Sequence, residues 1–172
     1  MKSLCTFALI LLATISLSTL SHADEIWLSS LDLAGVEQGW GSPHADKSVE
    51  GHELSIAGRK FAHGLGTHAT GRIKVIFDGK PERFSAWAGV DDETDGRGSV
   101  EFEVDANGTP VWKSGVMRAG DAAKEVNVDL AGVKTLVLKV GDAGDGIGYD
   151  HADWADAKFV MLSGKPKIYV RP

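Results

Sequence analysis

The sequence predicts an all-β protein built as an antiparallel β-sandwich, and three observations support that class. Several short segments alternate apolar and polar residues with a period of two, which is typical of strands with one buried face. The connections between these segments are rich in Gly and Asp, as at residues 91–98, 115–121 and 141–150. No long stretch carries the apolar stripe of an amphipathic helix.

The predicted strands follow one another at short intervals along the chain. They cover residues 72–77, 84–90, 99–104, 126–130, 136–140 and 158–162. In the first of them Ile73, Val75 and Phe77 share one face, while polar residues lie on the other. The segments 84–90 and 158–162 are more continuously apolar, which indicates burial on both faces. Asn107-Gly108 predicts a type I′ hairpin, because both residues tolerate a positive φ.

The N-terminal residues 1–23 are predicted to be a secretory signal peptide that does not belong to the fold. A positive charge precedes a mostly apolar run at 4–20, and a small-residue cleavage site ends at Ala23. A membrane anchor is the alternative, but a spanning helix needs roughly 20 strongly apolar residues. Cleavage would remove Cys5, the only cysteine, so we expect a disulfide-free protein that is secreted or periplasmic.

The remaining chain has the size of one domain, since compact domains contain roughly 100–200 residues. We expect the domain to cover residues 24–162 and residues 163–172 to form a C-terminal tail or linker. The tail contains two prolines and a short apolar run at 168–170, so an additional edge strand is the alternative.

The charge of the chain argues against two classes of partner. With 24 acidic and 18 basic residues, the formal net charge is −6, and the sequence has no basic cluster. An acidic chain of this kind is a poor candidate for binding nucleic acid or an anionic membrane surface. Acidic loops are compatible with calcium ions or neutral sugars.

Six segments together resemble a known family. They are GLGTHA at 64–69, GVDDE at 89–93, DAGDGIGYDHADWADA at 142–157, WLSSLD at 27–32, GWG at 39–41 and RGSV at 97–100. In order and spacing they resemble the NPCBM family of carbohydrate-binding modules over about residues 25–162. Two positions depart from the family pattern. Gly148 stands where the family has Asn, and Ser30 stands where it often has Asp, which weakens a metal role for Ser30.

The resemblance implies a fold, a ligand and a setting. The fold would be a jelly-roll β-sandwich of the galactose-binding type. The ligand would be a terminal galactose-type sugar, and a structural calcium ion often accompanies it. Such modules are usually attached to glycoside hydrolases, including α-galactosidases, so a catalytic domain could be appended to this chain.

Carbohydrate binding requires an aromatic ring against the sugar and polar groups at its hydroxyls. Trp40, between two glycines, and Trp154, among polar residues, are the candidate rings, although either could instead be a packing residue. His68 and His151 are candidate hydrogen-bonding groups, because a neutral imidazole can donate and accept. The alternative for both histidines is a structural hydrogen bond.

The densest acidic group is formed by Asp91, Asp92 and Glu93. These carboxylates could bind sugar hydroxyls, help to hold a cation, or be solvated or hydrogen-bonded turn residues. We include all three as candidate carbohydrate ligands.

The sequence offers a calcium site only by combining distant segments. Calcium prefers six to eight oxygen ligands, many of them from loops. The acidic stretch at 142–157 does not match the EF-hand pattern. Asp156 could close a site with Asp46 and Ser48 from an early loop, as in related sandwich modules.

Three classes of function remain for comparison. A non-catalytic carbohydrate-binding module is favoured by the resemblance, with glycan as partner and no catalytic residue in the module itself. A structural or protein-interaction sandwich of the cell envelope is the alternative. A small glycoside hydrolase is the third class, since it needs only two suitably spaced carboxylates. Neighbours such as Asp91 and Asp92 would point to opposite faces of an extended strand, which argues against it.

Overall fold

The computed structural model describes residues 23–171. Most of the predicted signal peptide at 1–23, including Cys5, therefore lies outside the described residues. Within residues 23–171, no helix is long and apolar enough to cross a membrane.

The described chain consists of strands joined by turns and three short 3-10 helices. The strands are β1 (Asp24–Trp27), β2 (His44–Ala45), β3 (Ser55–Ile56), β4 (Arg59–Lys60), β5 (Gly64–His68), β6 (Gly71–Val90), β7 (Ser99–Ala106), β8 (Thr109–Arg118), β9 (Lys124–Asp129), β10 (Thr135–Gly141) and β11 (His151–Ile168). The 3-10 helices are η1 (Leu28–Ser30), η2 (Leu33–Gly35) and η3 (Asp92–Thr94). Every strand pairing is antiparallel.

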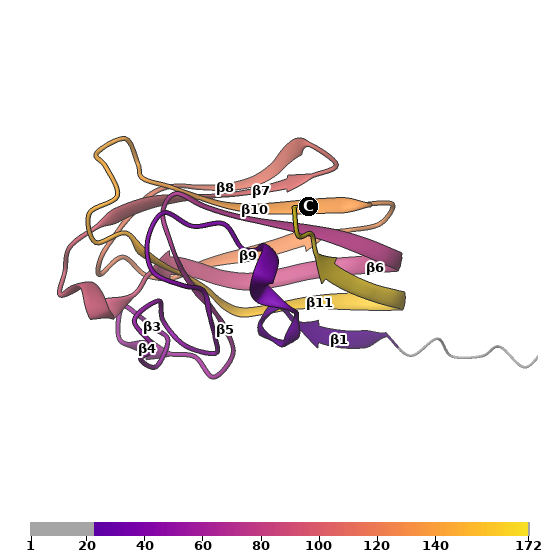
Figure 1. Ribbon diagram of the computed structural model, residues 1–172, viewed down its shortest axis with the longest axis horizontal. Coiled ribbons are helices and arrows are strands. Elements are labelled where there is room, and N and C mark those ends of the chain that lie inside the picture. Colours follow the sequence, from indigo (N-terminus) through magenta and orange to yellow (C-terminus); the bar gives the residue numbers. More distant parts are fainter. Residues whose placement is uncertain (1–22, 172) are drawn as a thin grey trace, which may run out of the picture.

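The strands form the two layers of a sandwich, which Figure 1 shows from the side. In one layer the first part of β6 pairs with β10, and β7 and β8 follow outward. In the other layer the second part of β6 lies between β9 and β11. Beyond β11 this second layer continues with β5 and β2 at one end and with β1 at the other. The all-β sandwich predicted from the sequence is confirmed.

The long strands β6 and β11 pass from one layer to the other as a pair. Gly79 and Gly164 are register partners at the crossing, and both have a positive φ, 125° and 73°. A Cβ on Gly79 would lie 2.2 Å from the carbonyl oxygen of Ser163. Only glycine permits this approach of the two backbones, so the crossing requires it.

The core between the layers is dominated by aromatic side chains. Trp154, Phe84, Phe102 and Phe159 are completely or almost completely buried. The rings of Phe102 and Trp154 meet edge to face, with centroids 4.9 Å apart. This packing fixes the strands whose ends carry the loops at one end of the sandwich.

Two sequence predictions about connections can be compared with the structure. The hairpin between β7 and β8 turns at Asn107 and Gly108, whose φ values of 50° and 83° match the predicted type I′ turn. The predicted tail at 163–172 does not begin at 163. Strand β11 continues through Ile168, which pairs with Val75, so the alternative of an additional strand describes residues 163–168.

Candidate functional site

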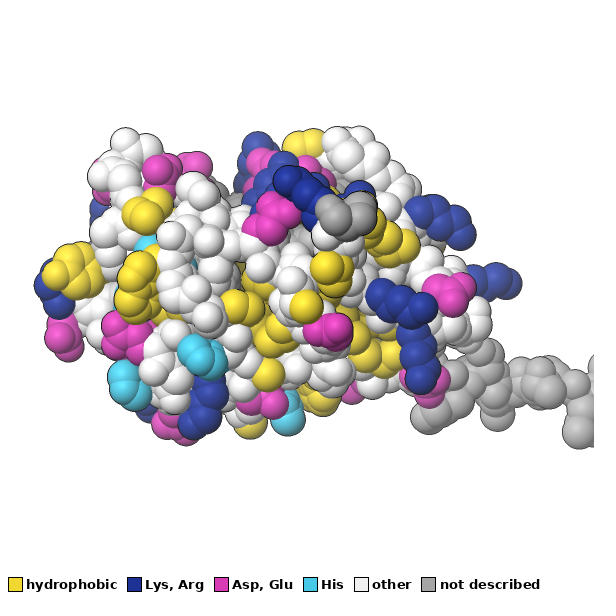
Figure 2. Space-filling model, in the orientation of Figure 1, with side chains coloured by type: hydrophobic (Ala, Val, Ile, Leu, Met, Phe, Trp, Pro, Cys, Tyr) yellow, Lys and Arg dark blue, Asp and Glu magenta, His cyan; other side chains and the backbone are white. Residues whose placement is uncertain are grey.

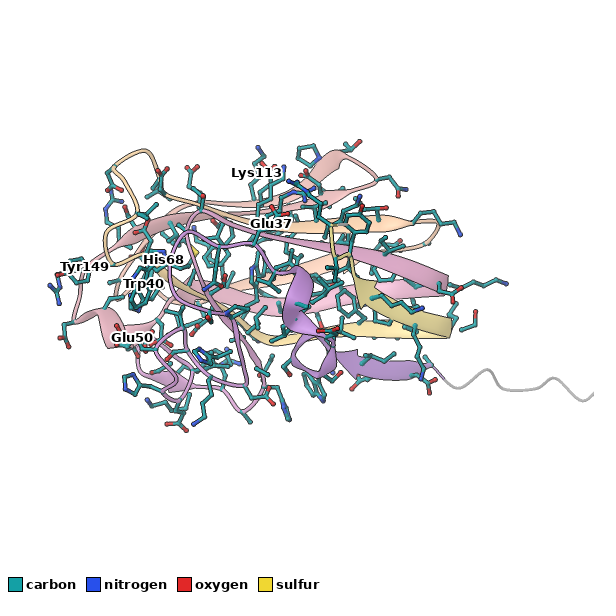
Figure 3. The ribbon with its side chains drawn as sticks, in the orientation of Figure 1. Glu37, Trp40, Glu50, His68, Lys113 and Tyr149 are labelled. Atoms are coloured by element: carbon teal, nitrogen blue, oxygen red, sulfur yellow. The ribbon has the colours of Figure 1, made fainter. Side chains whose placement is uncertain are left out.

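The candidate site lies at the loop end of the sandwich, where β5 ends and β11 begins. His68 is the last residue of β5, and His151 is the first of β11 and its direct cross-strand partner. Their ring centroids are 5.3 Å apart. Figure 3 shows His68 and Trp40 side by side at this end, with Tyr149 close by. The sequence-predicted residues Trp40, His68 and His151 are therefore brought together.

Trp40 covers the two imidazoles from the loop between η2 and β2. Its ring is stacked on His151 at 17° and 5.6 Å, and lies 5.5 Å from His68. Gln38 anchors this loop, because its side chain donates to the Trp40 carbonyl and accepts from Thr67 of β5. Trp40 nevertheless remains 50% exposed. A large aromatic ring that is held in place but half open to solvent is suited to ligand contact.

The hydrogen bonds of the histidines define which ring nitrogens are free. His68 Nδ1 donates to the Ala69 carbonyl at 2.6 Å, and His151 Nδ1 donates to Glu93 Oε1 at 2.7 Å. Both acceptors lack a hydrogen, so Nδ1 carries the proton and Nε2 is left for a ligand. Burial lowers the pKa of His68. The hydrogen bond to the Ala69 carbonyl opposes this shift, and the nearby imidazole of His151 adds to it. His68 is thus neutral at neutral pH, with Nε2 as an acceptor.

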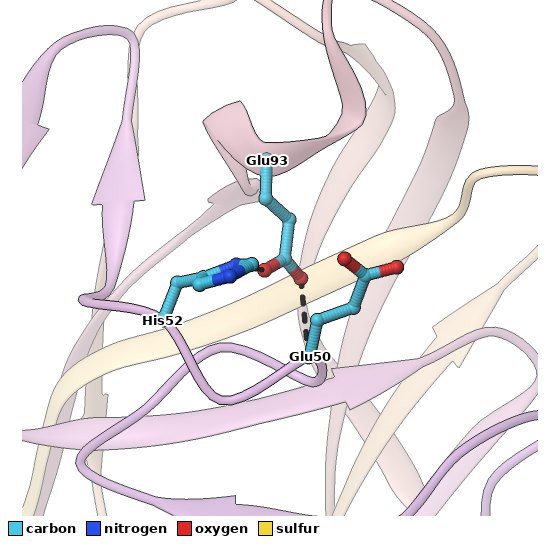
Figure 4. A group of neighbouring side chains, drawn as sticks. All are labelled: Glu50, His52 and Glu93. Atoms are coloured by element: carbon cyan, nitrogen blue, oxygen red, sulfur yellow. Dashed lines mark hydrogen bonds and ion pairs between the residues drawn. The ribbon is translucent and has the colours of Figure 1, made fainter.

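Glu93 organises the polar side of the site. Its carboxylate accepts hydrogen bonds from His151, His52 and Ser48, and more weakly from the Glu50 backbone. Burial alone would raise the pKa of Glu93, but the hydrogen bonds outweigh it and lower the pKa to about 2. Glu93 is therefore ionised, and its carboxylate links the 48–52 loop to His151. Figure 4 shows its bonds to His52 and to the Glu50 backbone.

Glu93, Glu50 and His52 also form a group that could hold a metal ion. One ligand atom from each lies within 4.8 Å of the others. A cation at this position would compete with the protons that Ser48 and His52 already present to Glu93. The arrangement is better described as a hydrogen-bonded carboxylate than as a metal centre.

Asp91 and Asp92, both predicted as carbohydrate ligands, accept hydrogen bonds from backbone N–H groups of the protein. Asp91 is 1% exposed and accepts from the backbone N–H groups of Ser55 and Glu93. Asp92 accepts from the backbone N–H groups of Ala57 and Gly58, both at 2.8 Å. The two carboxylates fasten the β3–β4 hairpin to η3, so the alternative of hydrogen-bonded turn residues applies to them.

Trp154 is not a ligand platform, and its prediction is corrected to a core residue. It is 0% exposed and pairs with Leu65 and Ala88, which also face the core. Alternation along β11 directs the neighbouring Asp153 to the opposite face. The polar neighbours of Trp154 in the sequence therefore reflect the outer face of the sheet, not the environment of the indole.

The sequence analysis missed Asp153 as a structural group. It lies between Gly66 and Gly89 of the adjoining strands, on the sheet face that the β3–β4 segment covers. A Cβ on Gly89 would lie 2.5 Å from Ile56, so the missing side chain makes room for that cover. Burial, reinforced by the negative charge of Asp91, raises the pKa of Asp153 well above its ordinary value. Burial therefore favours the protonated form of this carboxyl group.

A second residue that the sequence analysis missed is Tyr149, which is 48% exposed at the same end. The Arg97 guanidinium lies 3.6 Å from the centroid of its ring. Asp150, the next residue, is buried and accepts from the Ser99 backbone, which holds the loop in place. The signal in the sequence that could have pointed to Tyr149 is the presence of an aromatic residue in the glycine-rich stretch at 144–149. In Figure 2, separate histidine side chains (cyan) are visible toward the lower left of this face, where Figure 1 places β3 and β4.

The three predicted metal ligands are only partly brought together. Asp156 donates its backbone N–H to the His63 carbonyl, and Asp46 Oδ1 lies 3.5 Å from His63 Nδ1. The hydroxyl of Ser48 instead donates to Glu93 and accepts from the His52 backbone. Ser48 is fully buried by these bonds, so its hydroxyl is not available to an ion beside Asp46.

Comparison with known proteins gives this geometry a family. The model of the NPCBM/NEW2 domain matches residues 24–160. The chain belongs to the NPCBM/NEW2 domain family. The CBM51 module of Clostridium perfringens GH95, solved in complex with methyl-galactose, is 34% identical to it. The match has a TM-score of 0.74 and covers 79% of this chain and 99% of that one.

Two other relatives extend the comparison. CBM51-2 of Clostridium perfringens ZmpB, solved with its INT domains and GlcNAc, is 33% identical with a TM-score of 0.74 over 80% of this chain and 32% of that one. Alpha-1,3-galactosidase B of Akkermansia muciniphila is 43% identical over 120 residues, which are 67% of this chain and 15% of the relative. This chain thus corresponds to a small part of that enzyme. The prediction of a non-catalytic carbohydrate-binding module is confirmed at the level of the family.

Proposed function

We propose that the NPCBM/NEW2 domain binds a terminal galactose-type residue at the site formed by Trp40, His68, His151 and Glu93. The observation that carries the proposal is the half-exposed ring of Trp40 beside two imidazoles whose Nδ1 atoms are engaged and whose Nε2 atoms are free. A pyranose stacked on the indole would place its hydroxyls at these nitrogens. The related module crystallised with methyl-galactose supports the choice of sugar.

The expected affinity is modest. Most hydroxyls of a terminal sugar remain in water, and each hydrogen bond gained replaces one to solvent. We expect a dissociation constant of roughly 0.1–1 mM for a monosaccharide, which corresponds to about −4 to −5.5 kcal/mol. A module of this strength acts by raising the local concentration of its partner at a glycan surface.

Isothermal titration with methyl β-galactoside tests the assignment. Wild-type protein should bind with saturation, and Trp40→Ala should weaken binding at least 10-fold. Trp112→Phe is a matched control, because Trp112 lies on β8 away from the site. Equal binding by wild type and Trp40→Ala would contradict the proposed site. Binding of methyl N-acetylglucosaminide in preference to the galactoside would contradict the proposed sugar.

We propose that the domain serves as an accessory to a secreted glycoside hydrolase. The similarity to part of the Akkermansia muciniphila alpha-1,3-galactosidase B supports this setting. The signal peptide predicted at residues 1–23 supports export. N-terminal sequencing of the exported protein should begin at Asp24, and retention of Met1 would contradict cleavage.

A structural calcium ion beside Asp46 and Asp156 is part of this proposal. Both aspartates flank His63 and have positive φ values of 57° and 45°, and both side chains are at least partly exposed. Carboxylates and backbone carbonyls are the oxygen donors that calcium prefers. EDTA should lower the melting temperature of wild type but not of Asp46→Ala. Identical melting curves of wild type with and without EDTA would contradict a structural ion.

A further inference from the structure

A hollow unrelated to the Trp40 site lies on the outer face of the layer formed by β9, β6, β11 and β1. Its volume is ≈ 320 Å³, at the lower end of the roughly 300–1,000 Å³ that is typical of small-molecule pockets. The aromatic and polar side chains that line it are those of Trp27, Ser85, Trp87, Glu125, Asp156 and Lys158. We refer to it as the sheet hollow.

Strand register explains why these side chains meet. Lys158 of β11 pairs with Ser85 of β6 on one side and with Trp27 of β1 on the other, so the three form a row across the sheet. Trp87 of β6 pairs with Glu125 of β9 in a second row. Alternation sends the intervening residues, such as Phe84 and Phe159, into the core. The sheet hollow is therefore built on paired strands, which hold its side chains more rigidly than loops would.

Both tryptophans have neighbours against their rings, among them the Lys158 ammonium, which lies 5.4 Å from the centroid of the Trp27 ring. The ring of Trp27 stacks on His63 at 4.3 Å and 24°, and the Arg59 guanidinium lies 4.2 Å from the ring of Trp87. Neither His63 nor Arg59 lines the sheet hollow. Both tryptophans are partly exposed and line the sheet hollow. Fixed indole surface of this kind packs well against the C–H face of a sugar ring.

The polar lining favours a neutral ligand. Lys158 Nζ donates to Glu25 at 2.7 Å, so its positive charge is already compensated. Glu125 and Asp156 add two carboxylates with no further Lys or Arg in the lining. Carboxylates accept hydrogen bonds from sugar hydroxyls, whereas they repel carboxylated or sulfated sugars.

We propose that the sheet hollow is a second carbohydrate-binding site, which accepts one neutral pyranose residue of a glycan. The site uses other strands and other tryptophans than the Trp40 site, so a monosaccharide can occupy either one alone. Two sites on one domain would allow it to engage two branches or chains of a surface glycan, which increases the overall avidity.

Nuclear magnetic resonance of the indole N–H groups tests the proposal directly. Uniformly ¹⁵N-labelled protein, as wild type and as Trp40→Ala, is titrated with methyl β-galactoside and methyl β-glucoside at constant calcium. Constant calcium is needed because Asp156 borders both the sheet hollow and the proposed ion. At least one of the two sugars should shift the Trp27 and Trp87 signals saturably, and the shifts should persist in Trp40→Ala.

Variants confirm the location. Glu125→Gln changes an exposed side chain and leaves the core intact, and it should weaken binding at the sheet hollow by about 3- to 10-fold. Asp129→Asn is its matched control on the same strand, outside the lining. Trp27→Ala should abolish the shift of the Trp87 signal, and the dispersion of the remaining spectrum reports whether this variant is folded.

Each outcome separates this proposal from the Trp40 site. If the Trp40 signal responds while Trp27 and Trp87 do not, the second site is overturned and the first is supported. A response at Trp27 and Trp87 alone supports the sheet hollow and overturns the Trp40 site. Silence of all three signals with both sugars overturns both. Equal shifts with a sialic acid methyl glycoside would overturn the proposed selectivity for neutral sugars.

Discussion

Replacing Glu93 by Gln is expected to reveal how much stability the buried carboxylate contributes through its hydrogen bonds. In the folded protein the pKa of Glu93 falls from its ordinary value of 4.5 to about 2. At 1.36 kcal/mol per pKa unit, this difference sets about 3 kcal/mol as the upper limit of the contribution near neutral pH. Glu93 is only 5% exposed, so screening by solvent is weak.

The pH dependence follows from the sign of the shift. The folded pKa is lowered, so the contribution is complete above pH 4.5 and is lost as the pH falls from 4.5 toward 2. Glu93→Gln cannot titrate at this position. The difference in unfolding free energy between wild type and variant should therefore be constant from pH 7 to pH 5 and should narrow at pH 4 and pH 3.

Urea unfolding followed by tryptophan fluorescence measures this difference. At an m-value of about 2 kcal/mol/M, a loss of about 3 kcal/mol lowers the urea midpoint by about 1.5 M. Glu50→Gln is the matched control, because Glu50 is an exposed neighbour whose backbone, not its carboxylate, bonds to Glu93. A wild-type-to-variant difference that stays the same at pH 7 and pH 3 would refute the assignment of the stabilisation to ionised Glu93.

Three further predictions concern the same end of the sandwich. The pKa of Asp153 is raised by burial and by Asp91, so its stabilising contribution disappears as the pH rises. The melting temperature of Asp153→Asn, relative to that of wild type, should therefore rise between pH 4 and pH 8. A difference in melting temperature that does not change with pH would contradict a raised pKa of Asp153. His151→Ala should weaken methyl β-galactoside binding at least 10-fold by titration calorimetry, and unchanged affinity would exclude His151 as a ligand. Gly89→Ala should lower the unfolding free energy by about 1–3 kcal/mol in urea, because its Cβ would meet Ile56 at 2.5 Å. An unchanged unfolding free energy would show that the β3–β4 segment can move to accommodate the additional methyl group.

The sequence by itself was sufficient to predict the fold class and to select all four residues of the proposed Trp40 site as candidate ligands. Alternating segments and an Asn-Gly hairpin report local backbone geometry, which depends on a few neighbouring residues. Trp40, His68, His151 and Glu93 were all among the predicted ligands, because indole, imidazole and carboxylate groups in glycine-rich loops are typical of sugar sites.

Only the tertiary structure shows which of the candidate ligand residues have a side chain that is accessible to a ligand. Trp40 and Trp154 looked alike in sequence, but register directs Trp154 into the core and leaves Trp40 half exposed. Asp91 and Glu93 are only two positions apart. The carboxylate of Asp91 accepts hydrogen bonds from backbone N–H groups, whereas that of Glu93 accepts from His151 and orients it. The sheet hollow joins Trp27 and Trp87, which are 60 positions apart. Such proximity is set by which strands pair, and strand pairing between distant segments leaves no local pattern in the sequence.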